Sequence, residues 1–241
     1  MTPGDQGAGR TGLRATVSAD LDAMARLKGR PPGPGAALDV LTLPGTWATL
    51  LFRLAAACHH GGLRPLSRLL YFLNLVVTGA DLAPGANVGP GLAIAHPVGM
   101  GWGTGFTCGR NVIMTGMVRF GTAATEDGSR AGEPTVGDEV VLLDGAKAMG
   151  PVTIGDRAVV AANALVLHDV APDALVVGQP ARHVRTRADR RGEVAPGGDR
   201  LGAATRLLAD LVTADPSTGF PGDGRAPGSG SPVAGAPPRA G

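Results

Sequence analysis

The sequence predicts a mainly β protein, a parallel β-helix of six-residue repeats preceded by a short α-helical segment. Three observations carry this prediction. An apolar residue recurs at every sixth position through the middle of the chain, and a second, mostly small residue follows four positions after most of these. The aromatic content is only 3%, which suits a narrow interior filled by Val, Leu, Ala and Met.

The apolar series has thirteen members and all are hydrophobic, whereas a hydrophobic content of 44% gives about six by chance. Its members are Leu82, Val88, Ile94, Trp102, Cys108, Met114, Phe120, Val136, Leu142, Ala148, Ile154, Val160 and Val166. A six-residue unit fits one short strand and one tight corner, where Gly, Asn or Asp permits a positive φ. Three such units close a triangular coil of about 18 residues, and stacked coils make a parallel β-helix.

The period breaks twice, and breaks in a solenoid are where functional segments are inserted. The first break, within 94–102, adds two residues next to His96. The second adds ten residues and produces a polar loop at 122–134 that contains Arg130 and Glu133. We therefore expect the functional side chains near these two breaks.

Composition divides the chain into four zones. They are a flexible N-terminal segment (1–35), a helical segment (36–78), the repeat domain (79–186) and a flexible C-terminal tail (187–241). In the first zone a short helix is expected from Ser18 to Leu27. In the second, apolar spacing predicts a helix from about Thr46 to His59, and Pro65 begins another that runs to about Val77.

Charge and cysteine content exclude several classes of protein. Lys and Arg number 22 against 20 Asp and Glu, so the basic excess of a nucleic-acid binder is lacking. Two cysteines, Cys58 and Cys108, cannot build a disulfide framework, which indicates a reducing compartment. The longest apolar stretches fall short of the roughly 20 residues of a membrane span, and no secretory signal is recognised. We expect a cytoplasmic protein without a transmembrane segment.

Six segments carry a family resemblance. They are Leu43–Arg53, Thr78–Ala86, Gly91–Gly99, Pro134–Asp138, Gly145–Gly150 and Val177–Arg182. In this order, with both breaks in place, they resemble the serine acetyltransferase branch of the hexapeptide-repeat acyltransferases. The resemblance implies a left-handed β-helix and an acetyl-CoA-dependent O-acetyltransferase that acts on a small hydroxyl acceptor as a homotrimer or a dimer of trimers.

The resemblance makes His96 the general base that takes the acceptor's proton as its oxygen attacks the thioester directly. It makes Asp81, fifteen residues earlier and near the same corner of the neighbouring coil, the carboxylate that orients His96. The plain alternatives are a surface histidine and a turn-capping aspartate. Backbone N–H groups are expected to hold the oxyanion.

The resemblance also places acetyl-CoA along the later coils, in a groove between neighbouring subunits. The implied contacts are Asp144, Gly145, Ala161, Ala162, His168 and Arg182. Many relatives have a small residue at 144 and Lys at 168, so these two positions depart from the pattern. No metal is expected: His96 and His168 lie about four coils apart, or roughly 19 Å at the spacing of parallel strands.

Two further departures leave the acceptor open. Serine-using relatives have an acidic residue before the catalytic histidine and an Arg-His pair in the long loop, where this chain has Ala95 and Gly132-Glu133. Glu133 and Arg130 are the candidate acceptor contacts, with a solvated loop charge as the alternative for Glu133. The departures predict weak or no activity on free serine. A sugar, polysaccharide intermediate or specialised metabolite is the alternative acceptor, and a catalytically silent trimeric scaffold is the alternative of another class.

Many serine acetyltransferases dock a C-terminal isoleucine into cysteine synthase. This chain ends Pro238-Arg-Ala-Gly241, which offers no apolar side chain to bury. We therefore expect no stable complex with cysteine synthase. Sub-micromolar binding in a calorimetric titration would contradict this expectation.

Overall fold

A computed structural model describes residues 12–123, 132–186, 201, 202 and 204 of the chain. The helices come first: α1 (Leu13–Leu27), α2 (Pro34–Val40), α3 (Pro44–His60) and α4 (Arg64–Thr78). The strands follow: β1 (Asp81–Leu82), β2 (Asn87–Val88), β3 (Ala93–His96), β4 (Gly101–Trp102), β5 (Thr107–Cys108), β6 (Ile113–Gly116), β7 (Arg119–Gly121), β8 (Thr135–Val136), β9 (Val141–Leu142), β10 (Lys147–Met149), β11 (Thr153–Ile154), β12 (Val159–Val160), β13 (Leu165–Val166), β14 (Ala174–Val177) and β15 (Arg182–Thr186).

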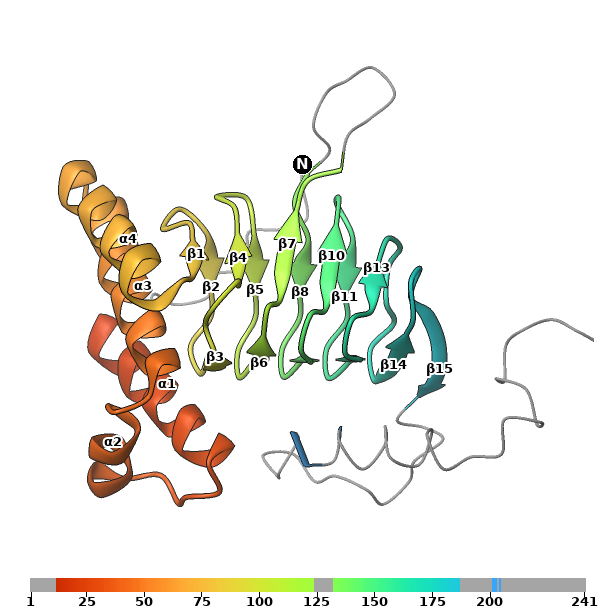
Figure 1. Cartoon of the computed structure of the whole chain (residues 1–241), viewed down its shortest axis with the longest axis horizontal. Coiled ribbons are helices and arrows are strands. Elements are labelled where there is room, and N and C mark those ends of the chain that lie inside the picture. Colours follow the sequence, from red (N-terminus) through yellow and green to blue (C-terminus); the bar gives the residue numbers. More distant parts are fainter. Residues whose placement is uncertain (1–11, 124–131, 187–200, 203, 205–241) are drawn as a thin grey trace, which may run out of the picture.

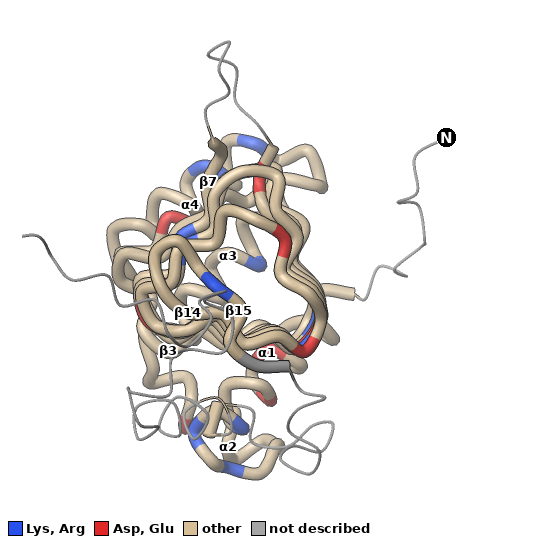
Figure 2. Tube along the Cα trace, turned by 90° about the vertical axis from the view of Figure 1, so that its right-hand side faces the viewer, with Lys and Arg blue, Asp and Glu red and all other residues tan. Residues whose placement is uncertain are grey.

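The strands form three sheets that share one stack of coils. Sheet A has the order β1-β4-β7-β10-β13, sheet B has β2-β5-β8-β11, and sheet C has β3-β6-β9-β12-β14-β15. All pairings are parallel except that of β15 with β14. The helices gather at one end of the stack and β15 closes the other (Figure 1). The coils superpose when viewed along the stack (Figure 2), and the predicted parallel β-helix is confirmed.

The strand register confirms both predicted breaks. Gly101 pairs with Arg119, so a regular coil has 18 residues. Asp81 pairs with Gly101, which makes the coil containing His96 two residues longer, at 20. Arg119 pairs with Lys147, and this coil has the ten extra residues of the long loop, at 28.

The core confirms the inward series. Of its thirteen members, all but Val88 are buried, and Val88 packs against the same core while half-buried. The small residues four positions later are buried as well, apart from Val98, which is 69% exposed. Val98 lies in the first insertion, where the chain leaves the regular wall, and Met100 takes the inward position instead at 0% exposure.

Helices α3 and α4 confirm the two helices predicted before the repeat. Both have Pro in the first turn, where the missing N–H leaves no hydrogen bond unmade. α4 ends at Gly79, whose φ of +72° stops the helix and turns the chain into β1. This turn places Tyr71 of α4 beside Asp81 of β1.

The short helix expected from Ser18 to Leu27 is confirmed by α1, which begins earlier, at Leu13. From residue 12 on, the zone differs from the flexible segment expected for 1–35, because α1 and α2 are folded against the rest of the chain. Asp20 of α1 is 4% exposed and accepts hydrogen bonds from the guanidinium of Arg53 in α3. It also accepts from the backbone N–H groups of Gly91 and Leu92 at the first coil. Arg53 donates in turn to two backbone carbonyls of that coil. One buried ion pair therefore fastens α1, α3 and the β-helix together.

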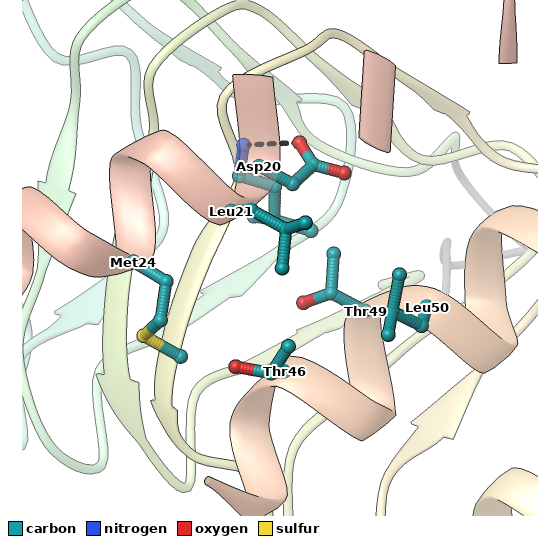
Figure 3. A pocket seen from close by; sticks show the side chains of 7 residues that line it. Asp20, Leu21, Met24, Thr46, Thr49 and Leu50 are labelled. Carbon is teal, nitrogen blue, oxygen red and sulfur yellow. Dashed lines mark hydrogen bonds between the residues drawn. The ribbon is translucent and has the colours of Figure 1, made fainter. Parts of the chain in front are cut away.

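A cavity of about 10 Å³ lies between α1 and α3, next to this ion pair (Figure 3). Asp20, Met24, Thr46 and Thr49 line it, and the hydroxyl of Thr46 is buried without a hydrogen-bond partner among the described residues. Its volume suits one water molecule at most. The cavity is therefore a packing feature of the helical cap and too small for an organic ligand.

Two further features concern the surface. Leu201 and Ala204 pack on the outer face of sheet C against Val141, Leu143 and other apolar residues.

Within the described ranges no single helix is both long and apolar enough to cross a membrane. Only α2 and α3 taken together meet that criterion of length and composition, and they are bent by 100° at the break between them.

Candidate active site

His96 is the last residue of β3, and its side chain is exposed where the chain leaves sheet C for sheet A. It pairs with Gly116 on the next coil. A Cβ atom on Gly116 would lie 3.2 Å from the Cβ of His96 and 2.5 Å from Oδ1 of Asp144. The glycine therefore leaves space beside the Cβ of His96, and the carboxylate of Asp144 fills part of that space.

A cavity of about 410 Å³ adjoins His96 and extends across successive coils of the stack. Its lining comes from these coils, the end of α1 and the C-terminal segment: Leu27, Lys28, Ala95, His96, Thr115, Leu143, Asp144, Ala162 and Leu201. The candidate base and two of the expected acetyl-CoA contacts, Asp144 and Ala162, thus share one cavity within a single chain. Gly145 and Ala161 are buried next to them in sequence.

Asp81, the candidate orienting carboxylate, opens β1 at the corner between sheets C and A, one coil before the corner that follows His96. Its Oδ1 accepts a hydrogen bond from the Tyr71 hydroxyl at 2.5 Å. Its Oδ2 lies 3.8 Å from Nη2 of Arg119. Within the described part of the chain the structure records no hydrogen bond between Asp81 and His96. The corner is shared as expected, but both carboxylate oxygens face other partners.

The hydrogen bond to Asp81 raises the pKa of Tyr71 to about 12, and burial adds to this effect. Tyr71 is the single tyrosine of the chain, so absorbance of tyrosinate reports on it alone. We expect a titration midpoint near 12 in the folded protein. Because the pKa of Tyr71 is raised in the folded protein, its hydrogen bond to Asp81 stabilises the fold. This stabilisation is complete below pH 10 and is lost as the pH rises through 12.

Asp81→Asn should return the midpoint toward 10, the ordinary tyrosine value. Circular dichroism at each pH is the control that the protein remains folded. A wild-type midpoint at the ordinary value, with the fold intact, would contradict the Tyr71–Asp81 hydrogen bond.

Glu133 lies at a different corner of the triangle, between sheets A and B. Its Oε1 accepts from the backbone N–H of Gly105 at 3.3 Å, and its carboxylate lies over Gly103. Its Oε2 is buried without a partner among the described residues. Within one chain Glu133 is thus not brought to His96. Arg130, the other candidate acceptor contact, is outside the described residues.

Two expected acetyl-CoA contacts lie away from the His96 cavity. His168 lines a separate cavity of about 200 Å³ near the end of the stack, together with Asp169 and His183. Arg182 is the exposed first residue of β15, where its Nη1 donates to the carbonyl of Ala181. Among the described residues no three His, Cys, Asp or Glu side chains come together as a metal site.

The comparisons decide the family. No family model matches the chain. The chain is 34% identical to the serine acetyltransferase of Mycobacterium tuberculosis over 191 residues, which cover 76% of this chain and 80% of that protein. The chain belongs to the serine acetyltransferase family. It is also 35% identical to the Helicobacter pylori serine acetyltransferase, covering 60% of this chain and 84% of that protein.

Solved structures of the family agree. The structure is similar to Neisseria gonorrhoeae serine acetyltransferase in complex with serine, with a TM-score of 0.63 and 29% identity over 72% of this chain and 69% of that one. The soybean serine acetyltransferase apoenzyme gives a TM-score of 0.63 and 32% identity over 71% and 69%. The fold is therefore the left-handed β-helix of serine acetyltransferases, as the sequence resemblance implied.

Five residues that line the cavity were not selected from the sequence: Leu27, Lys28, Thr115, Leu143 and Leu201. Lys28 follows α1, inside the range that was expected to be flexible, although it is one of only two lysines in the chain. Thr115 directly follows the inward residue Met114, so its outward position could have been read from the period of six. Leu201 comes from the C-terminal zone and carried no signal in the sequence.

Proposed function

We propose that the chain transfers the acetyl group of acetyl-CoA to the hydroxyl of serine, with His96 as the general base. The observation that carries this proposal is the exposed imidazole at the first insertion, in a cavity that continues across the coils to Asp144 and Ala162. Family membership supports the reaction, and the related structure in complex with serine supports the acceptor. The proposal replaces the expectation of weak activity on free serine that rested on Ala95 and Glu133.

The chemistry follows from these groups. As the acceptor oxygen attacks the thioester carbonyl carbon, a nitrogen of His96 takes the hydroxyl proton. The carbon–sulfur bond then breaks, and the departing CoA thiolate recovers a proton from the imidazolium. Backbone N–H groups near the corner stabilise the transient oxyanion. We retain Asp81 as the residue that orients His96, which requires its carboxylate to exchange Tyr71 or Arg119 for the imidazole.

The test is acetyl transfer measured by thiol release and by mass of the product, with serine set against a panel of sugars. Serine should be acetylated with a kcat/KM of at least about 10⁴ M⁻¹s⁻¹, the lower end for ordinary enzymes. Preference for a sugar would favour the alternative acceptor, which Ala95 and Glu133 keep open. Absence of both transfer and CoA binding would favour the silent scaffold.

We further propose that the chain assembles as a trimer or a multiple of one. Helix α4 supports this, because it presents an exposed apolar face larger than isolated surface residues account for. Its members, exposed by 43% to 64%, are Leu66, Leu69, Phe72, Leu73, Val76 and Val77. A neighbouring subunit would cover this face.

Light scattering should therefore give a mass of at least three times the 24.1 kDa of one chain. Leu69→Glu with Val76→Glu, two charges on the exposed face of α4, should shift the mass toward that of one chain. The matched control is Leu38→Glu, which charges an apolar residue exposed by 71% on α2. A fully active monomer at micromolar concentration would contradict the trimer.

The remaining assignments are proposals of the same kind. The proposed acetyl-CoA contacts are Asp144, Gly145, Ala161, Ala162, His168 and Arg182. The four zones of the sequence are the proposed domains, except that α1 and α2 belong with the helical segment. A cytoplasmic location rests on the cysteine content. The expected lack of a cysteine synthase complex stays a prediction, and it rests on a C-terminus outside the described residues.

A further inference from the structure

The two oxygens of the Asp81 carboxylate are held with very different strength. Oδ1 accepts a hydrogen bond from the Tyr71 hydroxyl at 2.5 Å, the short distance typical of a hydroxyl that donates to a carboxylate. Oδ2 lies 3.8 Å from Nη2 of Arg119, and the side chains of Arg119 and Asp81 are 52% and 43% exposed. An exposed ion pair at this distance contributes little to stability. Oδ2 is therefore the oxygen that Asp81 can release to another partner.

The fold keeps Tyr71 in place beside this carboxylate. Helix α4 leads directly into β1 at the helical end of the stack (Figure 1). Ser67 and Asn74 flank Tyr71 on α4, both are 1% exposed, and their side chains donate hydrogen bonds to backbone carbonyls of α3. Because α4 is fastened to α3 on both sides of Tyr71, the phenol is presented to Asp81 from a fixed backbone.

Arg119 is held far less firmly at the same corner. It begins β7, two coils after Asp81, and its guanidinium lies over Gly101, where a Cβ atom would approach Nη2 to 3.2 Å. Its Nη1 donates to the carbonyl of Gly99 at 3.4 Å, which is longer than the usual N–H···O distance. A planar guanidinium can nevertheless bind both oxygens of a carboxylate at once. Arg119 therefore competes with any other partner of Asp81.

We propose that Tyr71 is a positioning residue for the reaction, which keeps Oδ1 of Asp81 in place while Oδ2 exchanges Arg119 for a ring N–H of His96. This role of Tyr71 rests on the proposed function, in which Asp81 orients His96. Tyr71 and His96 then donate to the two oxygens of one carboxylate, and the second ring nitrogen of His96 faces the acceptor hydroxyl. Tyr71 keeps its own proton throughout, and Arg119 binds the carboxylate only in the resting state.

The first test removes the hydroxyl of Tyr71. In Tyr71→Phe both oxygens of Asp81 become available to the guanidinium of Arg119, which draws the carboxylate away from His96. Tyr71→Phe should therefore lower kcat with serine about tenfold, the loss expected for one hydrogen bond, and leave KM for serine and for acetyl-CoA unchanged. The same change in an Asp81→Ala background should lower kcat no further, since Tyr71 acts only through that carboxylate.

The second test removes the competitor. Arg119→Met should leave kcat at or above the wild-type value. Combined with Tyr71→Phe, it should restore most of the lost activity, because no guanidinium then draws the carboxylate away. Absorbance titration of Tyr71 should still give a midpoint near 12 in Arg119→Met, which shows that the hydrogen bond to Asp81 is intact.

Thr78→Val is the matched control. It removes another hydroxyl of α4, one whose hydrogen bonds go to the backbone carbonyl and the side chain of Asn74 within the helix. It should lower the midpoint of thermal unfolding and leave kcat at the wild-type value. A catalytic loss in Tyr71→Phe then cannot be assigned to a loosened helix.

Four outcomes with an active wild type would overturn this role of Tyr71 alone. They are a wild-type kcat in Tyr71→Phe, the same loss with and without Asp81, no recovery when Arg119→Met is added, and an equal loss in Thr78→Val. A wild-type protein that acetylates no acceptor would overturn the proposed function and the role of Tyr71 with it. The expected pattern on a sugar acceptor would support the role of Tyr71 and overturn only the choice of serine.

Discussion

Replacement of His96 by alanine or asparagine is expected to lower kcat for acetyl transfer by about 10²–10⁴-fold, the usual contribution of a general base. The imidazole is exposed at the end of β3 and lines the cavity, so its removal takes away the proton acceptor without disturbing the packed interior. Asparagine retains a polar side chain of similar reach but cannot take the proton. Both variants should therefore bind CoA as the wild type does.

Two measurements complete this test. His168 is the matched control, because it is also an exposed histidine of the β-helix but lines a different cavity. His168→Ala should keep the wild-type kcat and at most weaken acetyl-CoA binding. Asp81→Ala should cost less than His96→Ala, since a base without its orienting carboxylate still accepts a proton. A His96 variant with more than about a third of the wild-type kcat would remove this residue from the mechanism, because the loss would lie far below that of a general base.

The period of six was sufficient to predict the wall of the β-helix and the position of its insertions. The period does not predict the burial of Val88 and Val98 correctly. Val88 is only half-buried, and Val98 is exposed because the two extra residues of the first insertion displace the chain. His96 could be selected because the segment Gly91–Gly99 resembles the catalytic-histidine segment of the family, whereas its place at a break in the repeat also suits a surface histidine without a role. Its cavity could not be predicted in full, since Lys28 reaches it from the end of α1, in a zone that was expected to be flexible.

The contacts of the helical segment show why polar contacts between residues far apart in the sequence cannot be predicted from sequence patterns. Asp20 contacts Arg53, Gly91 and Leu92, which are between 33 and 72 positions away in sequence. Local spacing carries no information about such partners. One signal was nevertheless present: Arg53 is the only Lys, Arg, Asp or Glu in the apolar helix α3. A lone charge on a buried helix requires a buried partner of opposite charge. Asp20 is one of the two acidic residues of α1.

The Asp20–Arg53 pair leads to the largest expected effect on stability. Burial raises the pKa of Asp20, and the hydrogen bonds and charge of Arg53, with two backbone N–H groups, partly offset this. Both oxygens of the carboxylate accept from donors: Oδ1 from Gly91, Leu92 and Arg53, and Oδ2 from Arg53. Asp20→Asn keeps the shape of the side chain, but its amide nitrogen sets a donor against a donor. It also leaves the charge of Arg53 buried without a counter-ion.

Asp20→Asn should therefore lower the free energy of unfolding by about 3–5 kcal/mol, the usual cost of breaking a buried ion pair. Arg53→Met should cost a similar amount, and the double variant should cost less than the sum of the two because each single change strands the other partner. The measurement is denaturant unfolding followed by circular dichroism at one fixed chain concentration.

The exposed pair of Arg30 and Asp39 supplies the comparison that decides this prediction. Its atoms approach to 2.6 Å, closer than the 2.8 Å of Arg53 and Asp20, but its side chains are 59% and 50% exposed against 7% and 4%. Solvent screens the exposed pair, so Asp39→Asn should cost no more than about 1 kcal/mol. If Asp20→Asn costs as little as Asp39→Asn, burial does not set the strength of this contact. The packing of α1 within the helical segment would then rest on Met24 and its apolar neighbours instead.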